Sequence, residues 1–191
     1  MIVVLLAGGA GAYLSTRATA TTTTSTSTTT STVARTVTTA PPITHFTLSA
    51  VGDTDLGNTP QLPANPTAYL APVKAALSAD IVFGNLEGTM TNAGVSKCGA
   101  SSSECYAFRV PPSFARAYKD TGFTVLNSAN NHSYDFGAQG QAETSAALKA
   151  VGIVQAGLPG QIGVVHVHGV SVAFVDFAPY YLTNNMLIAR Q

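Results

Sequence analysis

The side chains best suited to chemistry are crowded into one short stretch, residues 127–137. It reads Asn-Ser-Ala-Asn-Asn-His-Ser-Tyr-Asp-Phe-Gly and follows an apolar, β-prone run. Amide and carboxylate oxygens with an imidazole can bind a divalent metal, and a His near an Asp can act as a proton donor or base. An Asx-rich turn that caps the next helix explains one Asn, but this combination favours a functional loop. Its candidate residues are Asn130, Asn131, His132 and Asp135.

Two earlier segments also pass from an apolar strand into acids or amides. The first leads to Asp53 and Asp55, and the second leads to Asn85 and Glu87. Helices of crossover length lie between the strands, so the strands can run parallel and bring their carboxyl ends together. Oxygen donors with one or two nitrogens at that edge would suit Mn²⁺, Fe²⁺, Zn²⁺ or Mg²⁺. A pair of such metals would lower the pKa of a bridging water and clamp a phosphoryl or acyl group.

The elements that position these loops follow from hydrophobic periodicity and from Gly and Pro punctuation. The predicted strands are 46–51, 80–84, 123–129, 162–167 and 170–175, the last two joined as a hairpin at Gly169. The predicted helices are 66–78, 111–120 and 139–151. The first of these helices is expected to bury an apolar face that includes Tyr69, Val73 and Leu77.

His166 and His168 lie two residues apart on the predicted hairpin, so they share one face of a strand. A hairpin brings no acids to meet them. We therefore interpret them as surface or half-buried strand residues and not as ligands.

Composition narrows the classes of partner. The 191 residues allow one domain of about 150 residues plus a tail. The net charge is zero and 9% of the residues are charged, so electrostatics point neither to nucleic acid nor to an anionic membrane surface.

The chain divides into three parts. Residues 1–14 are almost wholly apolar, but they are shorter than the ~20 residues of a bilayer span. They also lack the basic start of a complete signal sequence, so we interpret them as the remnant of a signal peptide or membrane anchor. Residues 15–42 are a Thr/Ser-rich tract that is expected to be a disordered tether, unless it is a biased tail without a role. The folded domain is expected at 43–191.

Cys98 and Cys105 lie in one polar loop, and six residues separate them. In an exported protein this spacing favours a disulfide over free thiols. A zinc pair is disfavoured because the chain has no other Cys and the spacing is not Cys-x-x-Cys.

Several of these motifs together resemble the CapA family of capsule or poly-γ-glutamate biosynthesis proteins, which are related to the calcineurin-like metallophosphoesterases. The main matches are residues 51–53, 80–87 and 129–137, and further matches lie at 108–111, 121–123 and 150–153. The likeness covers roughly residues 46 to 179, in order and with plausible spacing.

The resemblance implies an α/β fold, the calcineurin-like metallophosphoesterase sandwich with helix/sheet/sheet/helix layers and a metal centre at the strand ends. Asp53 corresponds to the acid of the first phosphoesterase motif, and Asn85 with Glu87 corresponds to the second. Asn131 is then a metal ligand and His132 a proton donor to a leaving group.

Asp135 is a candidate to orient His132, and Asn130 is a further candidate ligand. Asp55 departs from the pattern because the phosphoesterases have a His at its position; as an oxygen donor it remains a candidate ligand. The later His-containing motifs of the family would lie beyond Ala178, and neither His166 nor His168 fits them. The chain is therefore expected to hold the N-terminal portion of the fold only.

These observations predict an exported CapA-like protein, tethered to the membrane or cell wall, that acts in capsule or poly-γ-glutamate biosynthesis or export. The expected partners are an anionic extracellular polymer or its precursor and membrane-bound capsule synthesis components. A metal-dependent hydrolase or transferase site is one expectation, with Arg109 meeting substrate carboxylates unless it only solvates a face. The alternatives are a non-catalytic polymer-binding or assembly component and a generic metallophosphoesterase.

Overall fold

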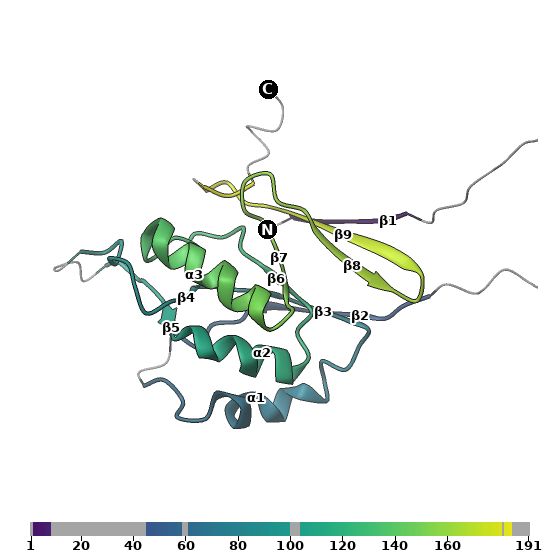
Figure 1. Cartoon of the computed structure of the whole chain (residues 1–191), viewed down its shortest axis with the longest axis horizontal. Helices are drawn as coiled ribbons and strands as arrows, with labels where there is room; N and C mark the ends of the chain where they lie inside the picture. Colours follow the sequence, from purple (N-terminus) through teal and green to yellow (C-terminus); the bar gives the residue numbers. More distant parts are fainter. Residues whose placement is uncertain (1, 9–44, 59–60, 100–103, 181, 185–191) are drawn as a thin grey trace, which may run out of the picture.

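A four-stranded parallel sheet carries the loops that the sequence analysis singled out (Figure 1). In the computed structural model its spatial order is β2-β3-β6-β7, and every pair is parallel, so the carboxyl ends of the strands meet at one edge. The strands are β2 (Leu48–Asp53), β3 (Ile81–Asn85), β6 (Val125–Asn127) and β7 (Val154–Ala156). The structure describes residues 2–8, 45–58, 61–99, 104–180 and 182–184.

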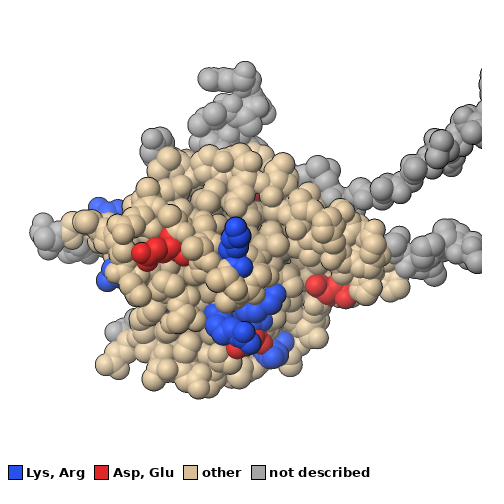
Figure 2. All heavy atoms as spheres, viewed as in Figure 1, with Lys and Arg blue, Asp and Glu red and all other residues tan. Residues whose placement is uncertain are grey.

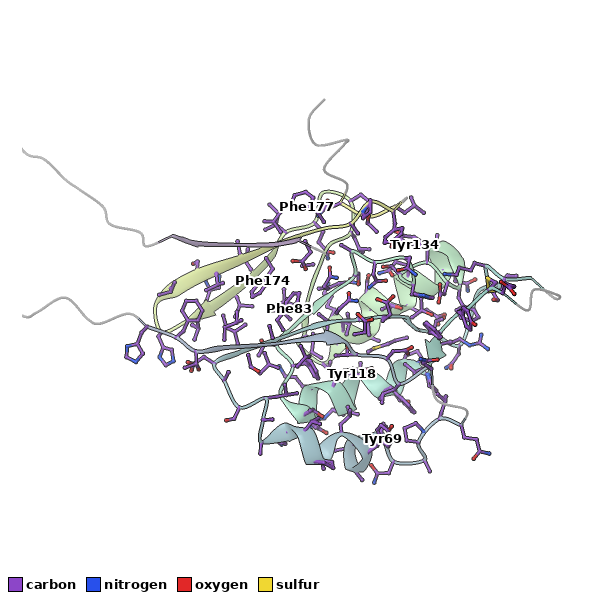
Figure 3. All side chains as sticks on the ribbon, turned by 180° about the vertical axis from the view of Figure 1, so that it is seen from behind. Tyr69, Phe83, Tyr118, Tyr134, Phe174 and Phe177 are labelled. Carbon is purple, nitrogen blue, oxygen red and sulfur yellow. A yellow bond between two sulfur atoms is a disulfide. The ribbon has the colours of Figure 1, made fainter. Side chains whose placement is uncertain are left out.

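A second, antiparallel sheet of order β1-β9-β8 packs on one face of the parallel sheet. Its strands are β1 (Ile2–Gly8), β8 (Gly163–Val167) and β9 (Val170–Phe177). Apolar residues of both sheets meet between them, and the rings of Phe83 and Phe174 stack with centroids 5.5 Å apart (Figure 3). The predicted hairpin is confirmed. Its turn has positive φ at His168 and Gly169, as a two-residue type I′ turn requires.

Helices cover the opposite face of the parallel sheet (Figure 1). They are α1 (Pro66–Lys74), the 3₁₀ turn η1 (Pro112–Phe114), α2 (Ala115–Thr121) and α3 (Gly137–Ala150), and a short parallel pair, β4 (Thr89–Met90) and β5 (Arg109–Val110), lies beside them. All five residues of β3 are buried, because helices cover one face of the sheet and the second sheet covers the other. The α/β fold with a parallel sheet and flanking helices is confirmed, and the described residues form its helix, sheet and sheet layers.

The structure corrects the prediction for the first helix. Tyr69 and Val73 are 57% and 47% exposed, and α1 buries none of its residues, so the predicted apolar face is wrong. Pro72 lies inside α1, and the helix ends at Lys74 and packs against α2. Of the three residues predicted for that face, only Leu77, beyond the end of the helix, is buried in the core, and Leu70 of α1 packs partly buried against that core.

The terminal segments are described only in part. Ile2–Gly8, within the segment interpreted as a signal or anchor remnant, pairs with β9 as an edge strand. The predicted tether, 15–42, lies outside the described residues. None of the helices in the described part of the chain has the length and apolar character that a bilayer span needs.

The disulfide predicted between Cys98 and Cys105 is present, with Cα atoms 5.4 Å apart. It closes the loop that runs between β4 and β5. The described residues of this loop belong to no helix or strand, so the cross-link restricts a segment that regular hydrogen bonding does not hold.

Asp176 places a carboxyl group between the two sheets. Asp176 lies on β9 on the same face as the buried Val172 and Phe174, because residues two apart in a strand point to one side, so its side chain faces the interior. It is fully buried, and neither of its carboxylate oxygens has a hydrogen-bond partner among the described residues. Burial raises the pKa of Asp176 to about 6.

We expect Asp176→Asn to remove a pH-dependent loss of stability. A raised pKa means that the fold disfavours the ionised acid, so the wild type is penalised least below the usual pKa of 3.8 and fully above about 6. The free energy of unfolding of the variant minus that of the wild type should therefore rise between pH 4 and pH 8, by roughly 2–3 kcal/mol. Urea denaturation at both pH values measures it. The exposed acid variant Glu104→Gln is the control, and a flat difference for Asp176→Asn would contradict the expectation.

The double variant Cys98→Ala/Cys105→Ala should lower the free energy of unfolding by about 2.5 kcal/mol, because the unfolded chain regains the freedom that the cross-link removes. Chemical denaturation with and without a phosphine reductant measures the effect. The reductant should destabilise the wild type by a similar amount and leave the double variant unchanged. Equal stability of all four samples would show that the cross-link does not stabilise the fold.

Candidate active site

Asn85, the last residue of β3, connects the carboxyl ends of neighbouring strands. Its Nδ2 donates to Asp53 Oδ1 at 2.8 Å and to Glu87 Oε2 at 2.6 Å. Its Oδ1 accepts from Asn127 Nδ2 at 2.6 Å and from Asn130 Nδ2 at 3.0 Å. One amide thus holds two acids on one side and two amides on the other.

The sheet register explains how Asp53 reaches Asn85. β2 and β3 pair regularly up to Ala50, and the register then shifts so that Asp53 lies opposite Asn85. Such a bulge re-aims a side chain at the end of a strand. The backbone N–H of Thr54 then donates to the carbonyl of Asn85 at 2.7 Å, which ties the following loop to β3.

The two adjacent amides of the 127–137 loop have different environments. Asn130 is buried, its Nδ2 also donates to the carbonyl of Leu86 at 2.8 Å, and its Oδ1 accepts from the backbone N–H of His132 at 2.9 Å. Asn131, the predicted ligand, is exposed. The structure therefore brings Asn130 into the network of Asn85, and a metal-binding role for Asn131 stays a prediction.

His132 is buried between an acid on each side. Its Nδ1 lies 2.7 Å from Asp135 Oδ2, and its Nε2 lies 3.8 Å from Glu87 Oε1. The ring of Phe108 packs on the imidazole with centroids 4.4 Å apart, and the backbone N–H of Phe108 donates to Asp135 Oδ2 at 2.6 Å. The structure thus gives Asp135 the contact that an orienting role requires, and the role itself stays a prediction.

Two acids of the site, Asp55 and Glu87, have a raised pKa. Burial raises the pKa of Asp55 to about 6, although backbone N–H groups of Gly57 and Asn58 oppose the shift. Burial also raises the pKa of Glu87; the hydrogen bond from Asn85 opposes this shift, and the nearby charge of Asp53 adds to it. A bound cation would favour the ionised forms of these carboxyls.

A metal fits this donor set as a hard, oxygen-ligated ion. Within the described ranges, no group of three His, Cys, Asp or Glu side chains gathers closely enough to hold a metal. Two carboxylates, Asp53 and Glu87, converge on one amide. Asp55 lines a pocket with Glu87, and its buried Oδ2 has no hydrogen-bond partner in the part of the chain that the structure describes. Mg²⁺ and Mn²⁺ accept one or two carboxylates and fill the remaining positions with water. Asn85 presents its NH₂ group to the acids. In this arrangement it therefore positions the carboxylates and does not offer an oxygen ligand to a cation that they would bind.

Arg109 lies at the rim of the same pocket, exposed, with its guanidinium over the ring of Phe136 at 4.4 Å from the centroid. Its predicted contact with a substrate carboxylate stays a prediction. His166 and His168 are exposed as expected, and the first contacts Ser171. His168 lies in the turn after β8 and its Nε2 is 2.9 Å from Asp80 Oδ1, so the expectation that no acid meets the two histidines is wrong for His168.

Two residues of the site were not identified from the sequence. Asn127 is fully buried at the end of β6 and donates to Asn85. The sequence held a signal for it, because Asn127 ends its strand as Asn85 ends β3. Gly157 lies against Asn127: a Cβ there would come within 2.5 Å of the backbone nitrogen of Ala129 and 2.6 Å of Asn127 Oδ1. Lys97 lies 2.6 Å from Asp135 Oδ1, and its polar loop gave no local signal.

Comparison with known proteins places this arrangement in a family. Residues 47–186 match the family described as bacterial capsule synthesis protein PGA_cap. The chain is 33% identical over 116 residues to the PGA biosynthesis protein CapA of Bacillus subtilis, covering 57% of this chain and 29% of that protein. It is 34% identical over 82 residues to the capsule biosynthesis protein CapA of Bacillus anthracis, covering 40% and 20%. It is 32% identical over 114 residues to the uncharacterized protein y4sH of Sinorhizobium fredii, covering 59% and 24%.

The chain spans less than a third of the length of these relatives. The family match itself extends from the first strand of the parallel sheet to beyond the end of β9, and it includes every residue of the site described above. This chain therefore belongs to the bacterial capsule synthesis protein family PGA_cap.

Proposed function

We propose that the chain acts in the biosynthesis of an extracellular capsule polymer of the poly-γ-glutamate type, and that its site carries out metal-dependent hydrolysis or group transfer. The biosynthetic role is supported by the family and by the names of the two Bacillus relatives. The observation that carries the chemical part is a buried His132 held by one acid and facing a second, at the edge where Asp53 and Glu87 share one amide.

Asp53 and Glu87 would hold the divalent cation, with water in its remaining positions. A bound cation of this kind neutralises developing charge and polarises a phosphoryl or acyl oxygen. Asp135 fixes the Nδ1 side of His132, which leaves Nε2 on the side of Glu87. When the imidazole carries a proton on both nitrogens, Nε2 can give its proton to a leaving group, which is a typical task of a positioned imidazole.

The proposed substrate is the anionic polymer or its precursor, with a phosphoester or an amide as the reacting bond. Arg109, exposed at the pocket rim, would contact a carboxylate of the polymer. The proposed setting is outside the cytoplasm, with the chain tethered to the membrane or cell wall beside membrane-bound capsule synthesis components.

A second candidate function is binding or assembly of the polymer without turnover. Figure 2 shows Lys and Arg side chains gathered over α2 and the end of α3, and the last turns of these helices contain Lys119 and Lys149. A basic surface of this kind attracts an anionic polymer whether or not chemistry follows.

The purified 191-residue chain, loaded with Mn²⁺ or Mg²⁺, should hydrolyse a phosphodiester or a γ-glutamyl model substrate. Asp53→Asn should weaken Mn²⁺ binding, measured by calorimetry, by more than about tenfold, because even groups that only support a ligand contribute about 10–100-fold to metal affinity. His132→Gln should leave Mn²⁺ binding intact and lower kcat by roughly 10²–10⁴-fold.

Arg116→Gln is the matched control, since Arg116 is exposed on α2 and pairs only with Asp120 among the described residues. It should leave Mn²⁺ binding and the kcat for the small model substrates unchanged. Absence of metal binding and of turnover in the wild type, together with retained binding of poly-γ-glutamate, would overturn the catalytic proposal and support the second candidate. Turnover of the phosphodiester alone would identify a generic phosphoesterase.

A further inference from the structure

Lys97 lies 38 positions before Asp135 in the sequence and contacts it twice. The backbone N–H of Lys97 donates to the carbonyl of Asp135 at 2.7 Å, and Nζ lies 2.6 Å from Asp135 Oδ1. Nζ also donates to the carbonyl of Asn131 at 3.1 Å. Lys97 directly precedes Cys98, so the disulfide between Cys98 and Cys105 restrains the backbone beside Lys97.

Asp135 requires such a partner because its side chain is completely buried. An ionised carboxylate in the interior is costly unless a cation and hydrogen bonds compensate its charge. Oδ2 accepts from the N–H of Phe108 and faces Nδ1 of His132. Among the described residues, Oδ1 has no hydrogen-bond partner and is compensated by the ion pair with Lys97. Lys97 is therefore the compensating cation for this acid.

The contact with Asp135 selects which nitrogen of a neutral His132 carries the proton. An ionised acid can only accept, so it holds a proton on Nδ1 and leaves Nε2 on the side of Glu87. Lys97 Nζ lies 3.5 Å from Nδ1, but an ammonium has no lone pair to accept that proton. Lys97 and His132 thus contact the same carboxylate through different oxygens, Oδ1 and Oδ2 of Asp135, and do not compete for one acceptor.

We propose that Lys97 is a positioning residue, which holds the Asp135 carboxylate in place against His132 Nδ1 and thereby fixes the orientation of the imidazole. The consequence for turnover rests on the function proposed above, but the effect on the imidazole does not. Lys97 itself touches none of the acids at the edge of the sheet that would hold a cation, among the contacts of the described residues.

The test compares Lys97→Met with Lys97→Arg, which restores the cation, at one fixed pH of 7.5. In ¹⁵N-histidine-labelled protein, the wild type should show a slowly exchanging Nδ1–H resonance, assigned by its loss in His132→Gln. Lys97→Met should lose this resonance or shift it upfield, and Lys97→Arg should retain it. Lys119→Met is the matched control, because Lys119 also donates to a backbone carbonyl, that of Gly152, away from the site.

An unchanged Nδ1–H resonance in folded Lys97→Met would overturn the proposal. If Lys97→Met fails to fold, Lys97→Gln supplies the same comparison with a neutral donor of similar reach, and an unchanged resonance there has the same meaning. In the metal-loaded protein, Lys97→Met should lower kcat by roughly 10–100-fold with KM unchanged, and Lys97→Arg should recover it. A wild type without turnover but with the expected NMR changes would refute the proposed function and leave the role of Lys97 standing.

Discussion

The site depends on one carboxamide. Asn85 uses both ends of its side chain, donating to two acids and accepting from two amides that follow the neighbouring strand. A carboxylate in its place could not donate, and an apolar residue could do neither. Parallel strands bring backbone ends together, but only a group that donates and accepts at once can join acids to amides there. The amide therefore converts a general property of the fold into a specific arrangement of side chains.

The rigidity of that amide comes from the layers on either side of β3. Two separate apolar clusters flank the parallel sheet, one formed with the helices and one with the antiparallel sheet. Gly84, next to Asn85, leaves no room for a side chain, since a Cβ would come within 2.7 Å of the Phe123 ring. A strand packed this closely has little freedom to shift. The loop that follows β3 therefore begins at a fixed position, whereas the acids Asp53 and Glu87 lie nearer the surface.

Much of the fold could be predicted because strand ends and hairpins have local signals. The strands around Asp53, Asn85 and the 127–137 loop were found from alternation and from Gly and Asp punctuation, and the hairpin from its Gly. β7 was not predicted, because three residues are too few to show a period. The apolar face of the first helix was wrong because Tyr69 and Val73 follow helical spacing on a helix that packs outside α2.

The site was predictable in outline and not in detail, for a physical reason. The sequence shows which loops carry donors, but not which of two adjacent amides turns inward, and here Asn130 is buried whereas Asn131 is exposed. That choice depends on acceptors such as the carbonyl of Leu86, 44 positions away in the chain. Lys97 could not be identified from the sequence for the same reason, since Asp135, the acid that it pairs with, is distant in the chain. Contacts that close over such separations leave no periodic trace.

Gly157 shows how narrow the tolerance of this arrangement is. Its φ of +99° already disfavours any residue with a side chain, and the space a Cβ would occupy is filled by Ala129 and Asn127. No substitution at this position fits without a structural shift, because even the Cβ of alanine would clash with the backbone of Ala129, which leads into the functional loop. A random-mutagenesis library should therefore return glycine alone at position 157, while the exposed face of α1 accepts many residues.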